Sequence, residues 1–406
     1  GRKVNRSPRS WLLRLPALTA RACLTGHPSP YLALHANDPV EWHVWGPAAL
    51  AEARATNRPL LISSGYFACH WCHVMQRESW QDPQIAELLN AHFIPVKLDR
   101  ELHPALDAYL IDFAEQSRGQ AGWPLNVFLT PAGHPFYAAL YLPADQMRAL
   151  SERIAALWQE RAETLADLAR QAARERVARA ASEAAEGGSD DSGDSGDSGD
   201  SGAIDGGALR AALLQSALQL GDPLSGGFGQ QTRFPKAPQL AALLELLADA
   251  RDAGRAEAEL ADLLRLTLDQ MAGQGLADHL AGGFFRYTID PGWQVPHFEK
   301  MLYTQALLVP VYLRAAVVLD RPQYLAIART TLDFMLSTMT APNGLMIASL
   351  SAVDAEGIEG GYYLWDAAEL ARVLTPSQRA VAALVWGLAG VPDQDGGLLP
   401  RRRAAP

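Results

Sequence analysis

The sequence Cys69-His70-Trp71-Cys72-His73 follows the apolar run Pro59-Leu60-Leu61-Ile62-Ser63 and precedes a segment with helical apolar spacing. A CxxC pair at the junction of a buried strand and a helix places its first sulfur near free backbone N–H groups, where the helix dipole favours a thiolate. The thiolate is the form that attacks disulfides. The motif therefore predicts a redox dithiol in which Cys69 attacks and Cys72 resolves the mixed disulfide.

The residues between and after the cysteines have two open roles each. When protonated, His70 and His73 would favour the thiolate, but either can also be a local hydrogen-bonding residue. Trp71 would cover the dithiol and shape the surface for a partner, or it would simply pack.

Three other interpretations of the motif stay open. CxxCH is also the attachment signature of c-type haem, although no secretory signal peptide is evident. A zinc site would combine Cys69, Cys72 and His73 with a remote histidine, although no second CxxC or distant HxxxH follows. The cysteines can also be buried structural residues. The redox interpretation needs no metal and no cofactor, and we expect neither.

Composition indicates a multidomain protein without a membrane span. The chain has 406 residues, of which 49% are hydrophobic, and the formal net charge is −10. This length suggests two or three domains, and no apolar run reaches the 18 residues of a membrane helix. The negative charge argues against nucleic acid as a partner. Only three cysteines occur, so no disulfide framework is expected.

Two charged segments set the expected domain limits. Residues 1–27 are basic and should form a disordered tail in a cytoplasmic protein, with organelle targeting as the alternative. Residues 186–206 contain four Asp-Ser-Gly repeats and should form a flexible linker, with calcium binding as the alternative. We therefore expect one domain at 28–185 and another at 207–406.

The first of these domains has the pattern of a thioredoxin-like fold. Helices are expected at 48–57, 83–90, 106–115 and 147–185, and strands at 60–63, 93–98, 125–129 and 136–140. The order of strand, helix, strand, helix, proline and hairpin is typical of that fold.

The second domain is patterned as helices. They are expected at 208–220, 239–253, 256–271, 298–318, 323–339 and 365–373. Pro310 should kink or split the fourth of them. Gly-rich aromatic loops separate the helices, as in an array of α/α hairpins.

Six motifs then give a resemblance to a known family. They are Ser29-Pro30-Tyr31-Leu32, His35-Ala36-Asn37-Asp38-Pro39-Val40-Glu41-Trp42, Cys69 to Met75, Gly119-Gln120-Ala121-Gly122-Trp123-Pro124, Arg233-Phe234-Pro235-Lys236 and Pro296-His297-Phe298-Glu299-Lys300-Met301-Leu302-Tyr303. Together they resemble the thioredoxin-domain proteins related to spermatogenesis-associated protein 20, over roughly residues 28–375.

The resemblance implies a thioredoxin-like domain followed by an α/α toroid similar to six-hairpin glycosidases and sugar epimerases. It also implies that Cys69 and Cys72 form the dithiol and that Pro124, after Trp123, is the cis-proline of the fold. A closed toroid of about twelve helices needs on the order of 350 residues. Since only 200 residues follow position 206, we expect a partial, C-terminally truncated toroid.

Sugar chemistry in the helical domain would need two carboxylates, or a base and an acid, facing one cavity. Glu299, close to His297, is the first candidate, with Asp290, Asp354 and Glu356 as partners. His297 to Lys300 can equally be a helix start whose glutamate caps N–H groups and pairs with a cation. Family members often carry a histidine in the loop at 283–287, an aspartate at position 304 and more acids at 349–357 than this chain does, which weakens the sugar interpretation.

The function predicted from sequence is a thiol–disulfide oxidoreductase fused to a sugar-enzyme-like helical domain. Its partner would be a protein disulfide or a small molecule. Two alternatives stay open. One is a carbohydrate-binding or carbohydrate-processing protein with a regulatory CxxC, whose partner would be a saccharide. The other is a scaffold without catalysis. Neither nucleic acid nor membrane is an expected partner.

Overall fold

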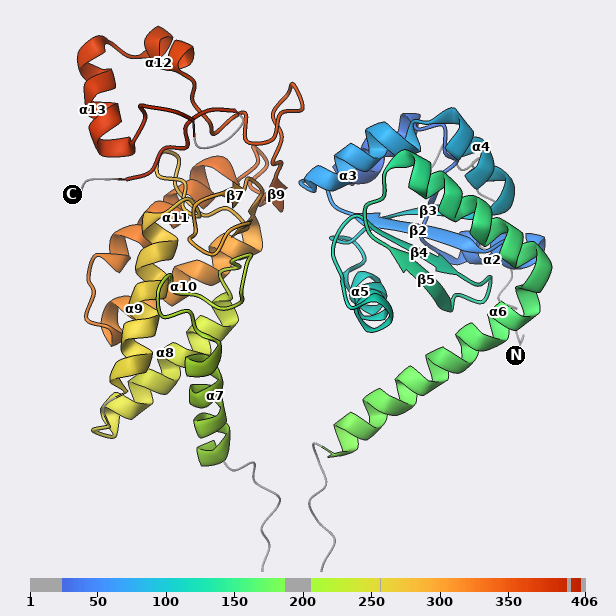
Figure 1. Ribbon diagram of the computed structural model, residues 1–406, viewed down its shortest axis with the longest axis horizontal. Helices are drawn as coiled ribbons and strands as arrows, with labels where there is room; N and C mark the ends of the chain where they lie inside the picture. Colours follow the sequence, from blue (N-terminus) through green and yellow to red (C-terminus); the bar gives the residue numbers. More distant parts are fainter. Residues whose placement is uncertain (1–23, 187–205, 256, 393–395, 403–406) are drawn as a thin grey trace, which may run out of the picture. The chain divides into compact units, whose positions relative to one another are not determined.

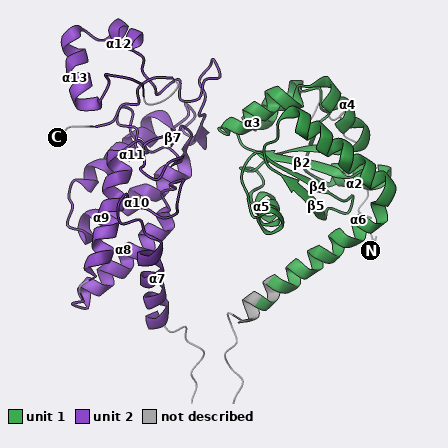
Figure 2. Ribbon diagram, viewed as in Figure 1, with its two compact units in different colours: residues 1–187 green, residues 188–406 purple. Residues whose placement is uncertain are grey.

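The computed structural model describes residues 24–186, 206–255, 257–392 and 396–402. The chain divides into two compact units, residues 1–187 and residues 188–406 (Figure 2). The expected basic tail up to residue 23 and the Asp-Ser-Gly repeats lie outside the described residues. None of the described helices is long and apolar enough to cross a membrane.

The first unit is built on one five-stranded sheet with the order β1-β3-β2-β4-β5 (Figure 1). Its strands are β1 (His43–Val44), β2 (Leu60–Gly65), β3 (Ile94–Asp99), β4 (Leu125–Leu129) and β5 (Pro135–Ala139). Strand β3 pairs in parallel with β1 and β2, whereas β4 pairs antiparallel with β2 and β5. The fold is thioredoxin-like, as expected from the element order. Strand β1 was not expected.

Helices surround this sheet. They are α1 (Pro30–Leu34), η2 (His35–Asn37), α2 (Pro47–Thr56), α3 (His70–Met75), the π-helical turn η3 (Gln76–Trp80), α4 (Pro83–His92), α5 (Pro104–Arg118) and α6 (Ala144–Glu186). Non-helical dihedral angles at Arg161 interrupt α6. Proline opens α1, α2, α4 and α5, where its missing N–H costs nothing.

The two faces of the sheet have different character, because side chains alternate along each strand. On one face, Leu60 and Ile62 of β2 join Ile94 and Val96 of β3 in an apolar core that also includes residues of α2 and α5. The opposite face carries Ser63 and Gly65 of β2 and Lys97 and Asp99 of β3, which are paired in register. This second face of the sheet, which includes Gly65 just ahead of the dithiol segment, is therefore partly polar.

The second unit is mainly helical. Its helices are α7 (Gly206–Leu220), α8 (Ala237–Asp252), α9 (Ala258–Gly273), α10 (Leu302–Val318), α11 (Tyr324–Thr338), α12 (Ala367–Val373) and α13 (Pro376–Trp386). Helices α7 to α11 share one apolar core. Two short antiparallel sheets pair β6 (Tyr287–Thr288) with β7 (Pro296–His297) and β8 (Lys300–Met301) with β9 (Ser349–Leu350). This region agrees with the expected helical hairpins.

The start of one expected helix in this unit is wrong. The expected helix at 298–318 begins only at Leu302, because His297 still belongs to β7 and Lys300 and Met301 form β8. Pro310, which was expected to kink or split this helix, lies inside α10, and the helix is not split there. Its neighbours Val309 and Val311 are buried in the shared core, and this packing offsets the hydrogen bond that proline removes. Helix α13 was not expected.

Candidate active site

Cys69 and Cys72 lie at the start of α3, directly after β2, and are joined by a disulfide. Cys69 is the N-cap residue of α3, and its Sγ accepts a hydrogen bond from the backbone N–H of Cys72 at 3.2 Å. An N-cap acceptor satisfies a helix N–H that would otherwise lack a partner. The same contact would stabilise a thiolate on Cys69 after reduction. Both cysteines are buried.

The residues flanking the dithiol have separate positions. Trp71 is 46% exposed, and its ring lies 4.8 Å from that of Tyr141 and 5.6 Å from that of His70. It therefore offers an aromatic surface next to the disulfide. His73 has its Nε2 2.7 Å from the carbonyl oxygen of Phe67, in the loop that precedes Cys69. That hydrogen bond fixes the loop, and it favours the local role for His73.

The peptide bond between Trp123 and Pro124 is cis, as predicted. The indole N–H of Trp123 donates to Asp107 at 2.9 Å, and the guanidinium of Arg100 lies 3.9 Å from the centroid of its ring. Tyr66, at the end of β2, packs edge-on against the same ring at 5.9 Å. These contacts tie the cis-proline loop to the segment that leads into Cys69.

A buried lysine lies on the sheet face below α1. Lys97 donates to the hydroxyl of Ser63 at 3.1 Å. Its ammonium is enclosed by the rings of Tyr31, Trp42 and Trp80, with centroids at 5.4, 4.9 and 5.3 Å. Burial lowers the pKa of Lys97 to about 7, although the charge of Asp38 opposes the shift. Aromatic faces partly replace the water that this cation has lost.

Asp38, whose charge opposes this shift, lies in the segment before β1. Asp38 accepts hydrogen bonds from Trp42 at 3.0 Å and from Gln76 at 3.0 Å, and its Oδ2 lies 2.6 Å from Nδ1 of His35. Burial lowers the pKa of His35 to about 3, so the ring is neutral and donates its N–H to the carboxylate. Burial alone would raise the pKa of Asp38, but the hydrogen bonds from His35 and Gln76 lower it. The segment from His35 to Trp42 was singled out from the sequence only by its resemblance to the family.

The buried lysine makes the stability of the first unit depend on pH. Between pH 7 and its ordinary pKa of 10.5, Lys97 is neutral in the folded chain and protonated in the unfolded chain, so the free energy of unfolding rises with pH. The cost of the buried charge is therefore largest below pH 7. Lys97→Met should unfold at higher urea than the parent at pH 6.5, and its advantage should shrink by about 2 kcal/mol at pH 9.

Urea titrations of the oxidised protein at both pH values test this expectation. Lys236→Met, which removes an exposed lysine in the second unit, is the matched control and should leave the pH dependence of the first transition unchanged. An advantage of Lys97→Met that stays constant from pH 6.5 to pH 9 would contradict the assignment.

In the second unit, His297 and Glu299 do meet. Nε2 of His297 lies 2.9 Å from Glu299, and its Nδ1 lies 2.9 Å from Glu359. Glu299 is buried, and its other oxygen accepts from Arg286 at 3.0 Å. Burial alone would lower the pKa of His297, but hydrogen bonds to the two carboxylates outweigh this and raise it to about 9. The imidazolium is thus held between two glutamates.

The other three predicted acids lie in loops, where Asp290 and Asp354 accept backbone hydrogen bonds. Asp290 accepts from the backbone N–H groups of Gln294 and Val295 and shapes the turn before β7. Asp354 accepts from the N–H groups of Glu356 and Ile358 in a loop, where Glu356 is exposed. The interpretation of 297–300 as a helix start is wrong, because His297 belongs to β7, Lys300 belongs to β8 and α10 begins only at Leu302. The paired cation, however, is present as Arg286.

Glu359 and Arg286 were not among the site residues predicted from the sequence. Arg286 lies in the aromatic loop after Gly282 and Gly283, and Glu359 precedes the glycine pair at 360 and 361. Glycine-rich loops were the available signal, since such loops often line functional sites. Arg286 also lines a pocket of about 210 Å³, together with Lys236, Tyr303 and others, and no carboxylate lines that pocket.

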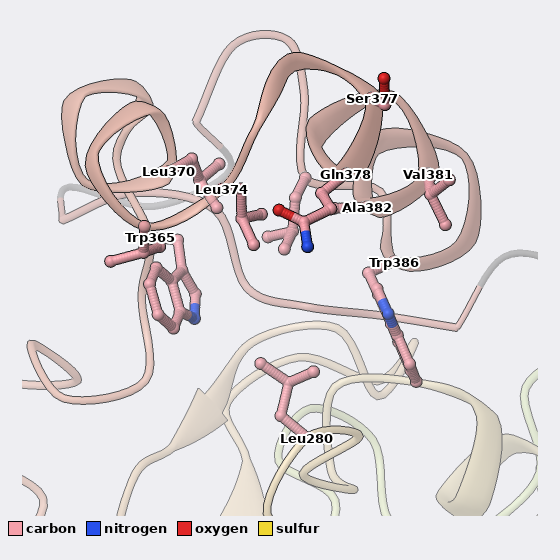
Figure 3. Close-up of a pocket in the computed structure, with 11 residues that line it drawn as sticks. Leu280, Trp365, Leu370, Leu374, Ser377, Gln378, Val381, Ala382 and Trp386 are labelled. Atoms are coloured by element: carbon pink, nitrogen blue, oxygen red, sulfur yellow. The ribbon is translucent and has the colours of Figure 1, made fainter.

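A larger pocket of about 450 Å³ lies elsewhere in the second unit (Figure 3). Helices α12 and α13 form its upper wall, and Leu280 closes it from below. Apart from Ser377 and Gln378 its lining is apolar, with Trp365 and Trp386 on opposite sides. It contains none of the predicted site residues. Within the described residues, no group of three or more His, Cys, Asp or Glu side chains is arranged to hold a metal ion.

Comparison with known proteins gives relatives for most of the chain. Residues 21–176 match the family model Thioredox_DsbH, described as "Protein of unknown function, DUF255". Spermatogenesis-associated protein 20 of Mus musculus is 33% identical over 368 residues, which are 86% of this chain and 44% of the mouse protein. The Homo sapiens protein of the same name is 32% identical over 363 residues, which are 85% of this chain and 44% of the human protein. The chain thus spans less than half the length of these relatives.

Among solved structures, a thioredoxin from Thermus thermophilus has 23% identity and a TM-score of 0.25, covering 29% of this chain and 89% of that chain. A structure entitled "DsbH Oxidoreductase" has 18% identity and a TM-score of 0.23, and the match covers 28% of this chain and 83% of that chain. A cellobiose 2-epimerase from Spirochaeta thermophila has 18% identity and a TM-score of 0.30, covering 36% and 39%.

Proposed function

From the premise that this chain is related to spermatogenesis-associated protein 20 and carries the thioredoxin-like DUF255 domain, we propose that it is a thiol–disulfide oxidoreductase. The observation that carries this proposal is the Cys69–Cys72 disulfide at the start of α3, with the N–H of Cys72 donating to the sulfur of Cys69. A sulfur that already accepts a helix N–H is the better thiolate of the pair. Cys69 is therefore the sulfur that exchanges with substrate.

The exchange runs through one mixed disulfide. A substrate thiolate attacks Sγ of Cys69, a bond forms between these two sulfurs, and the Cys69–Cys72 bond breaks with its electron pair left on Cys72. A second substrate thiol then releases Cys69 and leaves as the oxidised disulfide. Run in reverse, the reduced dithiol converts a substrate disulfide into two thiols. The substrate class is a protein or small-molecule thiol–disulfide pair that approaches the exposed face of Trp71.

Carbohydrate chemistry has less support in the second unit. Both oxygens of Glu299 are engaged, one by His297 and the other by Arg286. A general acid or base needs an oxygen that faces substrate. His297 is likewise engaged at both ring nitrogens. This cluster is better explained as a buried charge network that holds the loops together.

The experiment equilibrates the full chain with reduced and oxidised glutathione and counts free thiols by alkylation. A Cys23→Ser background leaves only the CxxC pair, which should titrate reversibly as one two-electron couple. The same protein should accelerate the reduction of a protein disulfide by dithiothreitol. Cys69→Ser/Cys72→Ser is the matched control and should not accelerate it. A parent no faster than this control, or a pair indifferent to the glutathione ratio, would sink the proposal.

A further inference from the structure

Tyr31 has a buried hydroxyl group that forms no hydrogen bond with any residue the structure describes. The residue itself is 1% exposed. Leaving a buried hydroxyl without a partner costs about 1–3 kcal/mol. A buried polar group of this kind calls for an explanation, and one explanation is a partner that is present only in another state of the protein.

A reactive group close to this hydroxyl is the sulfur of Cys72. Gly65 ends β2 and lies next to both side chains. A Cβ placed on Gly65 would be 2.3 Å from the hydroxyl oxygen of Tyr31 and 2.7 Å from Sγ of Cys72. Both distances are far below a van der Waals contact. The absence of a side chain at Gly65 therefore brings the tyrosine hydroxyl and the cysteine sulfur next to each other.

The ring of Tyr31 is held in this position from several sides. His35, one turn further along, packs edge-on against it at 5.1 Å, and the ammonium of Lys97 lies 5.4 Å from its centroid. Ser29 caps the same helix by accepting from the N–H of Leu32, and its hydroxyl donates to Asp99 at 2.6 Å. The hydroxyl thus cannot turn away to solvent.

The hydroxyl is also kept protonated. Burial, together with the charges of Asp99 and Asp38, raises the pKa of Tyr31 well above its ordinary value. A neutral phenol is a hydrogen-bond donor. In the disulfide state, the neighbouring sulfur is a weak acceptor, whereas a thiolate is a strong one.

We propose that the hydroxyl of Tyr31 donates a hydrogen bond to the sulfur of Cys72 when the Cys69–Cys72 bond opens. The inference rests on the proposed redox function. When a substrate thiolate forms its bond with Cys69, the electron pair of the broken bond stays on Cys72, and the hydroxyl stabilises that charge without giving up its proton. Tyr31 belongs to α1, which precedes the strands of the sheet in the sequence. The proposal therefore gives the segment at 29–42 a role in the exchange.

The proposal fixes the direction of a measurable change. The hydrogen bond exists only after the disulfide opens, so it stabilises the reduced state and makes the pair easier to reduce. Tyr31→Phe removes the hydroxyl alone. It should shift the glutathione equilibrium about tenfold toward the disulfide, which corresponds to about 30 mV for a two-electron couple.

The experiment measures this equilibrium for the full-length Cys23→Ser protein with and without Tyr31→Phe. Tyr137→Phe, on the edge strand β5, is the matched control and should leave the equilibrium within twofold of the parent. Urea unfolding of the oxidised and the reduced proteins supplies a second readout. Tyr31→Phe should leave the oxidised form as stable as the parent, or more stable, because it removes an unsatisfied hydroxyl, and it should destabilise only the reduced form.

Each other outcome is decisive. An unshifted equilibrium in Tyr31→Phe, with the parent still exchanging reversibly, overturns this inference and leaves the proposed function standing. Equal destabilisation of both redox states, or a protein that no longer folds, shows a structural hydroxyl and also overturns it. If the parent does not exchange with glutathione at all, both proposals fall together.

Discussion

Cys72→Ser should accumulate a stable mixed disulfide through Cys69, whereas Cys69→Ser should accumulate none. In the first variant the sulfur that receives the N–H of residue 72 remains, so Cys69 can still attack a substrate disulfide. The resolving thiol is gone, so the covalent adduct persists. In the second variant the remaining sulfur, that of Cys72, lies inside the first turn of α3 and does not receive that N–H, so it is the weaker thiolate.

Both single variants should lose turnover by roughly a thousandfold or more, because an intramolecular thiol is worth many orders of magnitude in effective concentration. Turnover alone therefore cannot distinguish the two cysteines, and the adduct can. The measurement is mass spectrometry of each variant, in a Cys23→Ser background, after incubation with a protein disulfide substrate. Equal adduct on both variants, or adduct on Cys69→Ser alone, would reverse the assignment of the attacking sulfur.

The position of this dithiol was predictable because its signals are local. An apolar run, a CxxC pair and a helical pattern follow each other within about twenty residues, and each has a known structural consequence. The cis bond before Pro124 was predicted from the family resemblance and from the proline that opens the third expected strand. Local patterns of this kind do not depend on which distant segments pair.

The contacts of Lys97 and Tyr31 were not predictable, because they depend on which distant segments pack together. Lys97 meets Ser63 only because β3 pairs with β2 in one parallel register, and strand pairing over more than thirty residues leaves no local mark. The hydroxyl of Tyr31 and the sulfur of Cys72 both lie beside Gly65, which the sequence shows only as one glycine among 33. Its role depends on the packing of α1 against β3.

The error at His297 has a different cause. If residues 297–300 began a helix, the side chains of His297 and Glu299 would point in different directions, because successive helical residues are rotated by about 100°. In an extended segment, residues two apart share a face. Both side chains can then meet the same partners. His297 ends β7, Glu299 lies just before β8, and the two side chains meet at 2.9 Å.

Glu299→Gln should destabilise the second unit by about 3 kcal/mol, since it breaks a buried ion pair and leaves Arg286 without its charged partner. Glutamine has nearly the same shape, so packing changes little and the loss reports on charge. Glu359→Gln is the matched control. It removes the carboxylate on the other nitrogen of the same imidazole, but Glu359 is 36% exposed and should cost about 1 kcal/mol or less.

The pH dependence separates this charge network from simple packing. His297 has an ordinary pKa of 6.5 and a pKa of about 9 in the folded chain, so its contribution is complete below pH 6.5 and is lost as pH rises through 9. In Glu299→Gln that loss between pH 6.5 and 9 should shrink, because the main partner that raises the pKa is gone. Urea unfolding of the full chain at both pH values measures it as the transition of the second unit. Equal costs for Glu299→Gln and Glu359→Gln, or an unchanged pH dependence, would show that the imidazolium is not held by Glu299.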